Sequence, residues 1–310
     1  MSIKVILVPV DDRPDASEAL GRALLVARRF DAHVRALHVA GSALDPAERM
    51  SNVPAIQREQ IREQAQRDAR ARAGRVRALV AEACEREGVP LVDGPHDTGK
   101  AAATGTAAQS VATAATGASV EWVEDAGDVA DTIVRHGRLS DVVVMSRPRR
   151  AGADEIFRAP AGRNLEAVML GTGRPLLIVP PKDESVVAPG LVRRVAIGWN
   201  ESQEAARALS QAMPWLAQME SVTLIVSRAR RPSADAVLAY LGRHGVTAGI
   251  ETLDRGERSA GAALLEACRR LEAEILVVGA FSHSRARQRL FGGVTRHLLA
   301  AASVITLMVH

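Results

Sequence analysis

Near its carboxyl end the chain reads Gly279-Ala-Phe-Ser-His-Ser-Arg-Ala-Arg-Gln-Arg-Leu-Phe-Gly292-Gly293-Val294-Thr295, a loop that opens and closes on glycine. The loop follows the apolar run Ile275–Val278, which is typical of a buried strand, and it leads into an expected helix over Thr295–Ala302. Glycines allow backbone N–H groups to approach an oxyanion closely, and a helix N-terminus adds unpaired N–H donors. The succession of strand, glycine loop and helix therefore predicts a site for phosphate.

Strand-like and helix-like segments alternate along the chain in two successive series. The expected strands are Ile3–Val10, Val34–Val39, Val120–Glu124, Val142–Met145 and Leu176–Val179 in the first series, then Val195–Gly198, Val222–Val226, Gly249–Leu253, Ile275–Val278 and Val304–Val309. Helical patterns lie between them; the first is expected to begin with Ser17 as its cap, and the longest covers Pro54–Glu87. Residues 15–20 and 204–209 share one pattern at the same distance past the first strand of each series, which indicates an internal duplication.

This alternation predicts an α/β fold with two tandem, doubly wound domains, each built on a five-stranded parallel sheet. We expect the first domain over residues 1–181 and the second over residues 191–310, joined by a proline-rich polar linker. A stretch rich in Ala, Thr and Gly, at about residues 94–118, is expected to be an insertion in the first domain.

The composition excludes several classes of function. Hydrophobic residues make up 47% of the chain, aromatic residues only 3%, and the net charge is +4, so the sequence offers little for stacking on nucleic-acid bases. The two cysteines, Cys84 and Cys268, form no metal-binding or disulfide motif. A strand is expected to begin at Ile3, which leaves no room for a signal peptide, and no apolar run reaches the roughly 18 residues of a membrane span. We expect a cytoplasmic protein with no membrane or nucleic-acid partner.

The glycine loop resembles the G-x-x-G-x9-G-[S/T] signature with which universal stress proteins bind ATP. Its position after the fourth strand of a series, the closing Gly-Val-Thr-Arg-His-Leu-Leu and the duplication all resemble the tandem form of that family. The resemblance implies a fold like that of the adenine nucleotide alpha hydrolases. It also implies that the last strands of the two domains pair, which would join the halves into an intramolecular pseudo-dimer; whether the chain also forms a homodimer stays open.

The resemblance further implies a binding site for ATP or AMP in the second domain, with Mg²⁺ accompanying ATP. The implied nucleotide-binding residues are Trp199, Asn200, Val226, Val278, Gly279, Ser282, His283, Arg285, Gly292, Gly293, Val294 and Thr295. At three of these positions the chain departs from the family pattern. Ser282 replaces a glycine, Gly293 replaces the Ser or Thr hydroxyl, and Asn200 replaces an aspartate. Trp199 could stack on the adenine or fill its pocket.

The first domain lacks this loop. Asp11 stands where the family has its aspartate, but Ser146-Arg-Pro-Arg-Arg150 follows the fourth strand, and Pro148 removes a backbone donor. We expect this domain to bind no nucleotide and to serve as the structural partner. Its arginines at 147, 149 and 150 are interpreted as solvated loop charge. The segment Gly94–Ala101 has the spacing of a phosphate-binding P-loop but lacks the Ser or Thr after Lys100, so we interpret the match as coincidence.

No arrangement of residues predicts catalysis or a metal site, so the chain would hydrolyse ATP slowly at most. The function implied is stress-linked regulation, in which nucleotide binding orders the glycine loop and changes the surface offered to a protein partner. Two alternatives stay open: a nucleotide-free interaction scaffold, and a protein that binds another small ligand between the two domains.

Overall fold

The computed structural model describes residues 2–41, 55–92, 117–149, 159–187, 190, 192–280 and 293–310. The first half of the chain contains, in order, β1 (Val5–Pro9), α1 (Pro14–Phe30), β2 (His33–Gly41), α2 (Ala55–Glu87), β3 (Leu91–Val92), β4 (Ser119–Gly127), α3 (Val129–Gly137), β5 (Val142–Ser146), α4 (Pro160–Gly171) and β6 (Leu176–Val179). A short 3-10 helix, η2 (Lys182–Glu184), follows in the connection to the second half.

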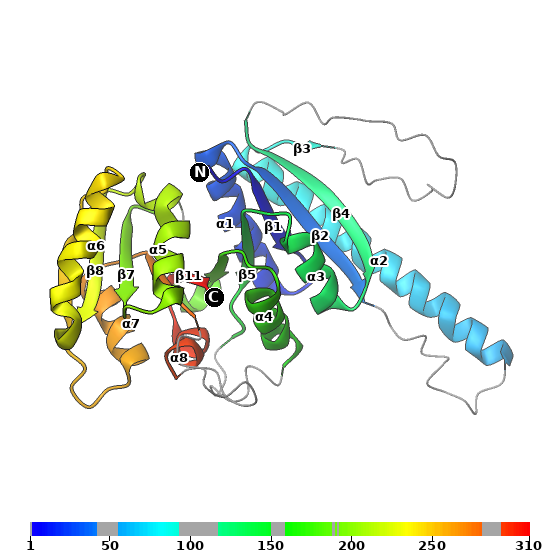
Figure 1. Ribbon diagram of the computed structural model, residues 1–310. Helices are drawn as coiled ribbons and strands as arrows, with labels where there is room; N and C mark the ends of the chain where they lie inside the picture. The colour runs from blue at the N-terminus through cyan, green and yellow to red at the C-terminus, as the bar shows by residue number, and fades with distance from the viewer. Residues whose placement is uncertain are drawn as a thin grey trace.

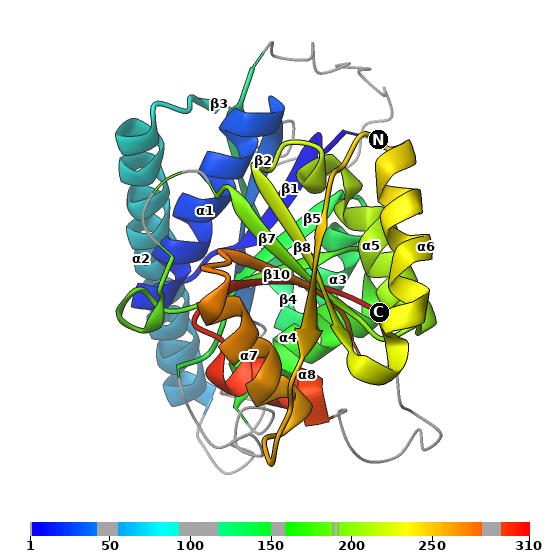
Figure 2. The ribbon, with the colours of Figure 1, turned by 90° about the vertical axis from the view of Figure 1, so that its left-hand side faces the viewer.

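The second half repeats this alternation. Its elements are β7 (Arg194–Trp199), α5 (Gln203–Leu216), β8 (Ser221–Ser227), the 3-10 helix η3 (Arg228–Arg230), α6 (Arg231–Arg243), β9 (Gly249–Leu253), α7 (Ala260–Arg270), β10 (Ile275–Gly279), α8 (Gly293–Ala301) and β11 (Ile305–Val309). The helices α7 and α8 pack against each other, as α3 and α4 do in the first half (Figures 1 and 2).

All the strands of the described residues belong to one 11-stranded sheet with the order β3-β4-β2-β1-β5-β6-β11-β10-β7-β8-β9. Within each half the strands are parallel, and the order reverses between β1 and β5 in the first half and between β7 and β10 in the second. The predicted α/β fold with two doubly wound halves is therefore confirmed. The first half carries one strand more than predicted, since β3 pairs in parallel with the edge of β4.

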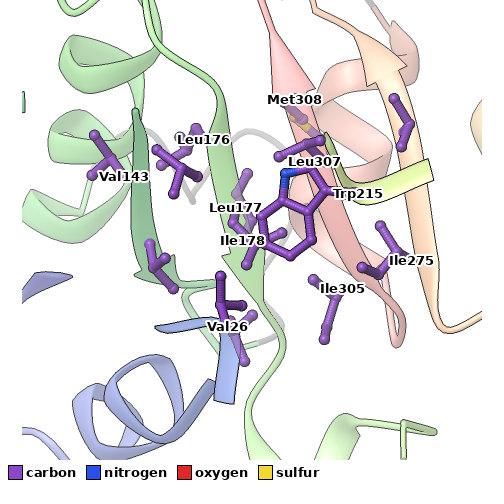
Figure 3. Packing of buried hydrophobic residues seen from close by; sticks show 14 of the residues in the cluster. Val26, Val143, Leu176, Leu177, Ile178, Trp215, Ile275, Ile305, Leu307 and Met308 are labelled. Atoms are coloured by element: carbon purple, nitrogen blue, oxygen red, sulfur yellow. The ribbon is translucent and has the colours of Figure 1, made fainter. Parts of the chain in front are cut away.

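The two halves meet where β6 and β11 pair, as the resemblance implied. This is the antiparallel pair of the sheet, with Leu177 opposite Leu307. Both leucines are buried, and the surrounding side chains come from both halves (Figure 3). Strand edges exposed to solvent invite uncontrolled pairing with other chains, so this contact also covers two edges that would otherwise be open.

Two arginines of α1 reinforce the contact between the halves. Arg22 donates hydrogen bonds to the carbonyl oxygens of Val187 (3.3 Å) and Gly190 (2.8 Å) in the connection between the halves. Arg29 donates to the carbonyl oxygen of Val192 at 2.7 Å, just before β7. These hydrogen bonds satisfy backbone carbonyl groups of the connection that belong to no helix or strand, and so they fix its position.

Two helices of the first half differ in how well the sequence predicted them. Helix α2 matches its prediction closely and ends at Gly88, whose positive φ of 65° suits the residue that terminates a helix. Helix α1 begins three residues before the predicted cap Ser17, because Pro14 occupies its first turn. Proline has a φ suited to a helix and its missing N–H would have no intrahelical partner there, so Pro14 starts the helix instead.

Candidate functional site

The second half contains a pocket of about 250 Å³ at the carboxyl ends of β7, β8 and β10. It lies where the strand order reverses, between β7 and β10, which is the usual ligand position in a doubly wound sheet. The first residues of α8, Gly293, Val294 and Thr295, form part of its wall. The N-terminal end of a helix therefore faces the pocket, and it brings backbone N–H groups and the positive end of the helix dipole.

The pocket wall carries positive charge. Arg230 and Arg255 both line it, and no Asp or Glu does so among the described residues. Arg230 Nε lies 3.3 Å from Oε2 of Glu201, which stands outside the lining. Two guanidinium groups and a helix N-terminus make this a pocket for an anion.

Two polar atoms of the wall have fewer hydrogen-bonding partners than buried polar atoms normally have. The hydroxyl of Ser227 is shielded from solvent and makes no hydrogen bond with the described part of the chain, and the Nε of Arg230 is shielded too, with Glu201 as an ion-pair partner at 3.3 Å but no hydrogen bond. A buried polar group without a partner costs free energy, and most such groups in proteins are satisfied. Both atoms belong to residues that line the pocket, so a ligand with hydrogen-bonding groups would stabilise them.

The end of β7 is held by a network of side chains. The Asn200 Oδ1 accepts hydrogen bonds from the backbone N (3.2 Å) and the Oγ (2.7 Å) of Ser202. Ser202 Oγ accepts in turn from the backbone N of Ala205 at 3.1 Å, which caps α5. Trp199 Nε1 donates to Ser233 Oγ at 3.3 Å. The asparagine that replaces the family's aspartate is thus part of the turn that begins α5.

The two described glycines of the predicted loop have different roles. A Cβ on Gly279 would lie 2.4 Å from the backbone nitrogen of Ala205, so the close packing of β10 against α5 requires glycine there. A Cβ on Gly293 would meet nothing within 4 Å. Replacing Gly279 would disturb the fold, whereas Gly293 accepts a side chain without a clash.

The structure brings most of the described candidate residues together. Seven of them line the pocket: Trp199, Asn200, Val278, Gly279, Gly293, Val294 and Thr295. Val226 is buried in β8 behind the wall, between the lining residues Ile225 and Ser227. Ser282, His283, Arg285 and Gly292 lie outside the described residues, as does the P-loop-like segment 94–101.

Sequence reasoning missed the side of the pocket formed by β8 and β9. Ser227, Arg230, Leu253 and Arg255 lie at or just after the carboxyl ends of these strands. The rule that ligands bind at these strand ends would have found them, because both strands were predicted. Arg230 was left out because its neighbours Arg228 and Arg231 give the segment the composition of a solvated loop.

The corresponding pocket of the first half is smaller, at about 150 Å³. Two of its charged residues pair with each other, since Asp11 accepts hydrogen bonds from the backbone N (3.0 Å) and the Nε (2.7 Å) of Arg13. Arg147, interpreted from sequence as solvated loop charge, is only 1% exposed and lines this pocket. That interpretation was wrong for Arg147, because its partners are distant in the sequence.

A larger hollow of about 630 Å³ lies elsewhere in the second half, and its lining includes Arg194, Arg258, Glu266 and His297. The His, Cys, Asp and Glu side chains of the described ranges form no group of three or more that could hold a metal ion. A cavity between the halves, next to Trp215 and Leu177, measures about 20 Å³, which is space for about one water molecule. No described helix has both the length and the apolar character needed to cross a bilayer.

The fold and the pocket at its switch point define a doubly wound α/β protein of the class that binds ligands at the carboxyl ends of its strands. The sequence profile of the Universal stress protein family matches residues 2–180, which is more than half of the 310 residues. The chain therefore belongs to the universal stress protein family. The profile match covers the first half, which lacks the glycine loop.

Solved structures extend the likeness to both halves. A universal stress protein from Archaeoglobus fulgidus DSM 4304 superimposes with a TM-score of 0.66 at 16% identity, covering 98% of this chain and 97% of that one. A functionally unknown protein from Pseudomonas aeruginosa PAO1 gives a TM-score of 0.55 at 13% identity, covering 99% of this chain and 92% of that one. At these identities the likeness shows the fold alone. No curated protein matches the sequence.

Proposed function

We propose that the second half binds an adenine nucleotide, ATP or AMP, and that the protein acts in regulation of a stress response through this binding. The observation that carries the proposal is the pocket at the switch point. It combines the N-terminal end of α8 with Arg230 and Arg255, and it contains no carboxylate among its described lining. These groups suit the phosphates of a nucleotide, and the apolar side chains Trp199, Ile225 and Leu264 suit its base.

The proposed mechanism is binding alone. The described residues of the pocket supply neither a general base nor a carboxylate that would hold Mg²⁺, so a magnesium ion arriving with ATP would be held by the phosphates and water. Bound nucleotide would accept hydrogen bonds from Ser227 and Arg230 and would change the surface around the pocket. A protein partner would then meet a different surface.

Gly293→Asp tests the proposal directly. The new side chain enters open space, and an acidic residue in the first turn of a helix is favourable, so the fold should be retained. The carboxylate would repel a phosphate at short range. We expect affinity for AMP to fall about tenfold or more, which corresponds to at least about 1.4 kcal/mol. Isothermal titration calorimetry on the full chain measures this.

The matched control is Gly242→Asp in α6, where a Cβ also meets nothing within 4 Å and which does not line the pocket. This variant should bind AMP like the wild type. A wild-type protein that releases no nucleotide on denaturation and binds neither ATP nor AMP at about 1 mM would overturn the proposal.

That negative outcome would favour a nucleotide-free interaction scaffold. One observation supports this alternative: the Asn200 oxygen already accepts two hydrogen bonds from Ser202. The pocket would then be a remnant in which the former ligand-binding position serves to begin α5. Asn200→Asp distinguishes the two functions, since we expect it to raise the affinity for adenosine only if the pocket holds a nucleoside.

A further inference from the structure

Arg147 is a buried arginine of the first half, directly after β5. Its backbone N donates to the carbonyl oxygen of Val179 at 2.7 Å, so the residue continues the contact of β5 with β6. Its side chain is among the largest fully buried ones of the described structure. Burying a charged side chain is costly unless it is paired, so the contacts of this guanidinium show why it is held there.

The guanidinium of Arg147 joins three separate parts of the chain. Its Nη2 donates to Oε2 of Glu184, in η2 of the connection between the halves. Its Nη1 donates to the carbonyl oxygen of the neighbouring Pro148 at 2.9 Å and to that of Ala300 at 3.1 Å. Ala300 belongs to α8, so this bond crosses from the first half to the second.

The bond to Ala300 is made at the C-terminal end of α8, while the N-terminal end of the same helix faces the nucleotide pocket. The last carbonyl oxygens of a helix have no partners within the helix, and a cation placed there is favourable. Helix α8 has only nine residues, and its first three line the pocket. A short helix moves as one piece, so fixing its C-terminal end also fixes its N-terminal end.

We propose that Arg147 is a positioning residue for the nucleotide site of the other half. It holds α8 against the connection between the halves, and thereby sets where the N–H groups of Gly293, Val294 and Thr295 lie. The inference rests on the proposed nucleotide binding. It gives the first half, which has lost its own glycine loop, a specific part in binding at the second.

The test compares the affinities for AMP and for adenosine. The variant Arg147→Met with Glu184→Gln removes the bond to Ala300 without leaving a buried carboxylate unpaired. Because α8 meets the phosphate and not the nucleoside, AMP affinity should fall about five- to tenfold while adenosine affinity stays unchanged. Arg147→Lys keeps the positive charge but loses the planar guanidinium, which donates several hydrogen bonds at once. We expect this variant to fold and to lose AMP affinity to an intermediate extent.

Arg149→Met is the matched control. Arg149 contacts Asp183 of η2 at 2.8 Å and Asp15 at 3.3 Å, and neither of these partners belongs to α8. Its loss should leave the ratio of AMP to adenosine affinity unchanged. Calorimetry on the full-length variants gives both affinities.

Hydrogen exchange of the ligand-free protein provides a second readout. We expect peptides covering α8 to exchange faster in the double variant, while those of α5 are unchanged. Equal weakening of AMP and adenosine, or unchanged exchange in α8, would overturn the role of Arg147. A wild-type protein that binds neither ligand overturns the proposed function, and exchange in α8 then still decides whether Arg147 fixes this helix.

Discussion

Glu121 of β4 is an acidic side chain that the fold keeps ionised although it is only 5% exposed. Burial opposes its ionisation, but the nearby ring of His33, whose Nε2 lies 3.7 Å from Oε1, and the hydrogen bond from Arg35 outweigh this effect and lower its pKa to about 2. The Nε of Arg35 lies 2.5 Å from the carboxylate. Because the folded pKa lies below the unfolded value of about 4.3, the folded state binds fewer protons, and the resulting stability is present above that value.

We therefore predict a pH-dependent effect of Glu121→Gln. The variant should lose up to about 3 kcal/mol of unfolding free energy at neutral pH, and this loss should shrink as the pH falls from about 5 toward about 2. Urea unfolding at several pH values measures it. Glu124→Gln, at an exposed position of the same strand, should change little. A loss that is independent of pH would show that packing, not ionisation, explains the effect of the substitution.

Single residues show why the site was only partly predictable. The strand, the loop glycines and the helix start of the pocket could be predicted, because each is specified by neighbouring residues. Arg147 could not, because Ser-Arg-Pro-Arg-Arg has the composition of a solvated loop. Its partner Glu184 lies 37 residues away and Ala300 lies 153 residues away. Burial of a charge is decided by such distant partners.

At the level of elements, the two ends of α2 differ. Among the side chains of this 33-residue helix that the structure describes, the buried ones are all in the C-terminal part: Ala73, Val76, Val80, Ala83 and Cys84. Figure 1 shows the other end extending beyond the sheet. Tertiary packing supplies most of the stability of a helix in a protein, so the two parts should respond differently to substitution.

We predict that Val80→Ala lowers the unfolding free energy by about 2 kcal/mol. Val80 is 1% exposed, so truncating its side chain leaves a cavity in the hydrophobic core where α2 packs. Gln60→Ala, at an exposed position on the same helix, should change it by less than about 0.5 kcal/mol. Both values come from urea unfolding monitored by circular dichroism. Equal effects at the two positions would mean that α2 is not anchored through its C-terminal part.

The elements also show where prediction from sequence ends. The continuous apolar run of β6 predicted this strand with its observed bounds, and the bounds predicted for β9 were also observed. Strand β3 has two residues, too few for a periodic signal, and only its pairing with β4 makes it a strand. The start of α1 was misplaced because Ser17 and Pro14 both signal a helix start, and local sequence alone did not decide between them.

For the whole molecule, the duplication has produced two halves with different remaining roles. The family profile matches the half whose pocket is smaller and is lined by the ion pair of Asp11 with Arg13. The open, positively charged pocket belongs to the other half. The same fold can therefore carry binding in one copy and support in the other, provided that the copies are tightly joined.

The buried contact between the halves predicts that they unfold together. One continuous hydrophobic core includes residues of both halves, and β6 pairs directly with β11.

Leu224 of β8 is fully buried in the second half, far along the sheet from β1. Leu224→Ala should cost about 3 kcal/mol, and peptides from β1 and from β8 should lose the same amount of protection against hydrogen exchange. The matched control Leu139→Ala, at a side chain that is 77% exposed, should change neither. If β1 kept its full protection while β8 lost it, the halves would be independent folding units, and a first half that unfolds separately could not hold α8 in place for the second.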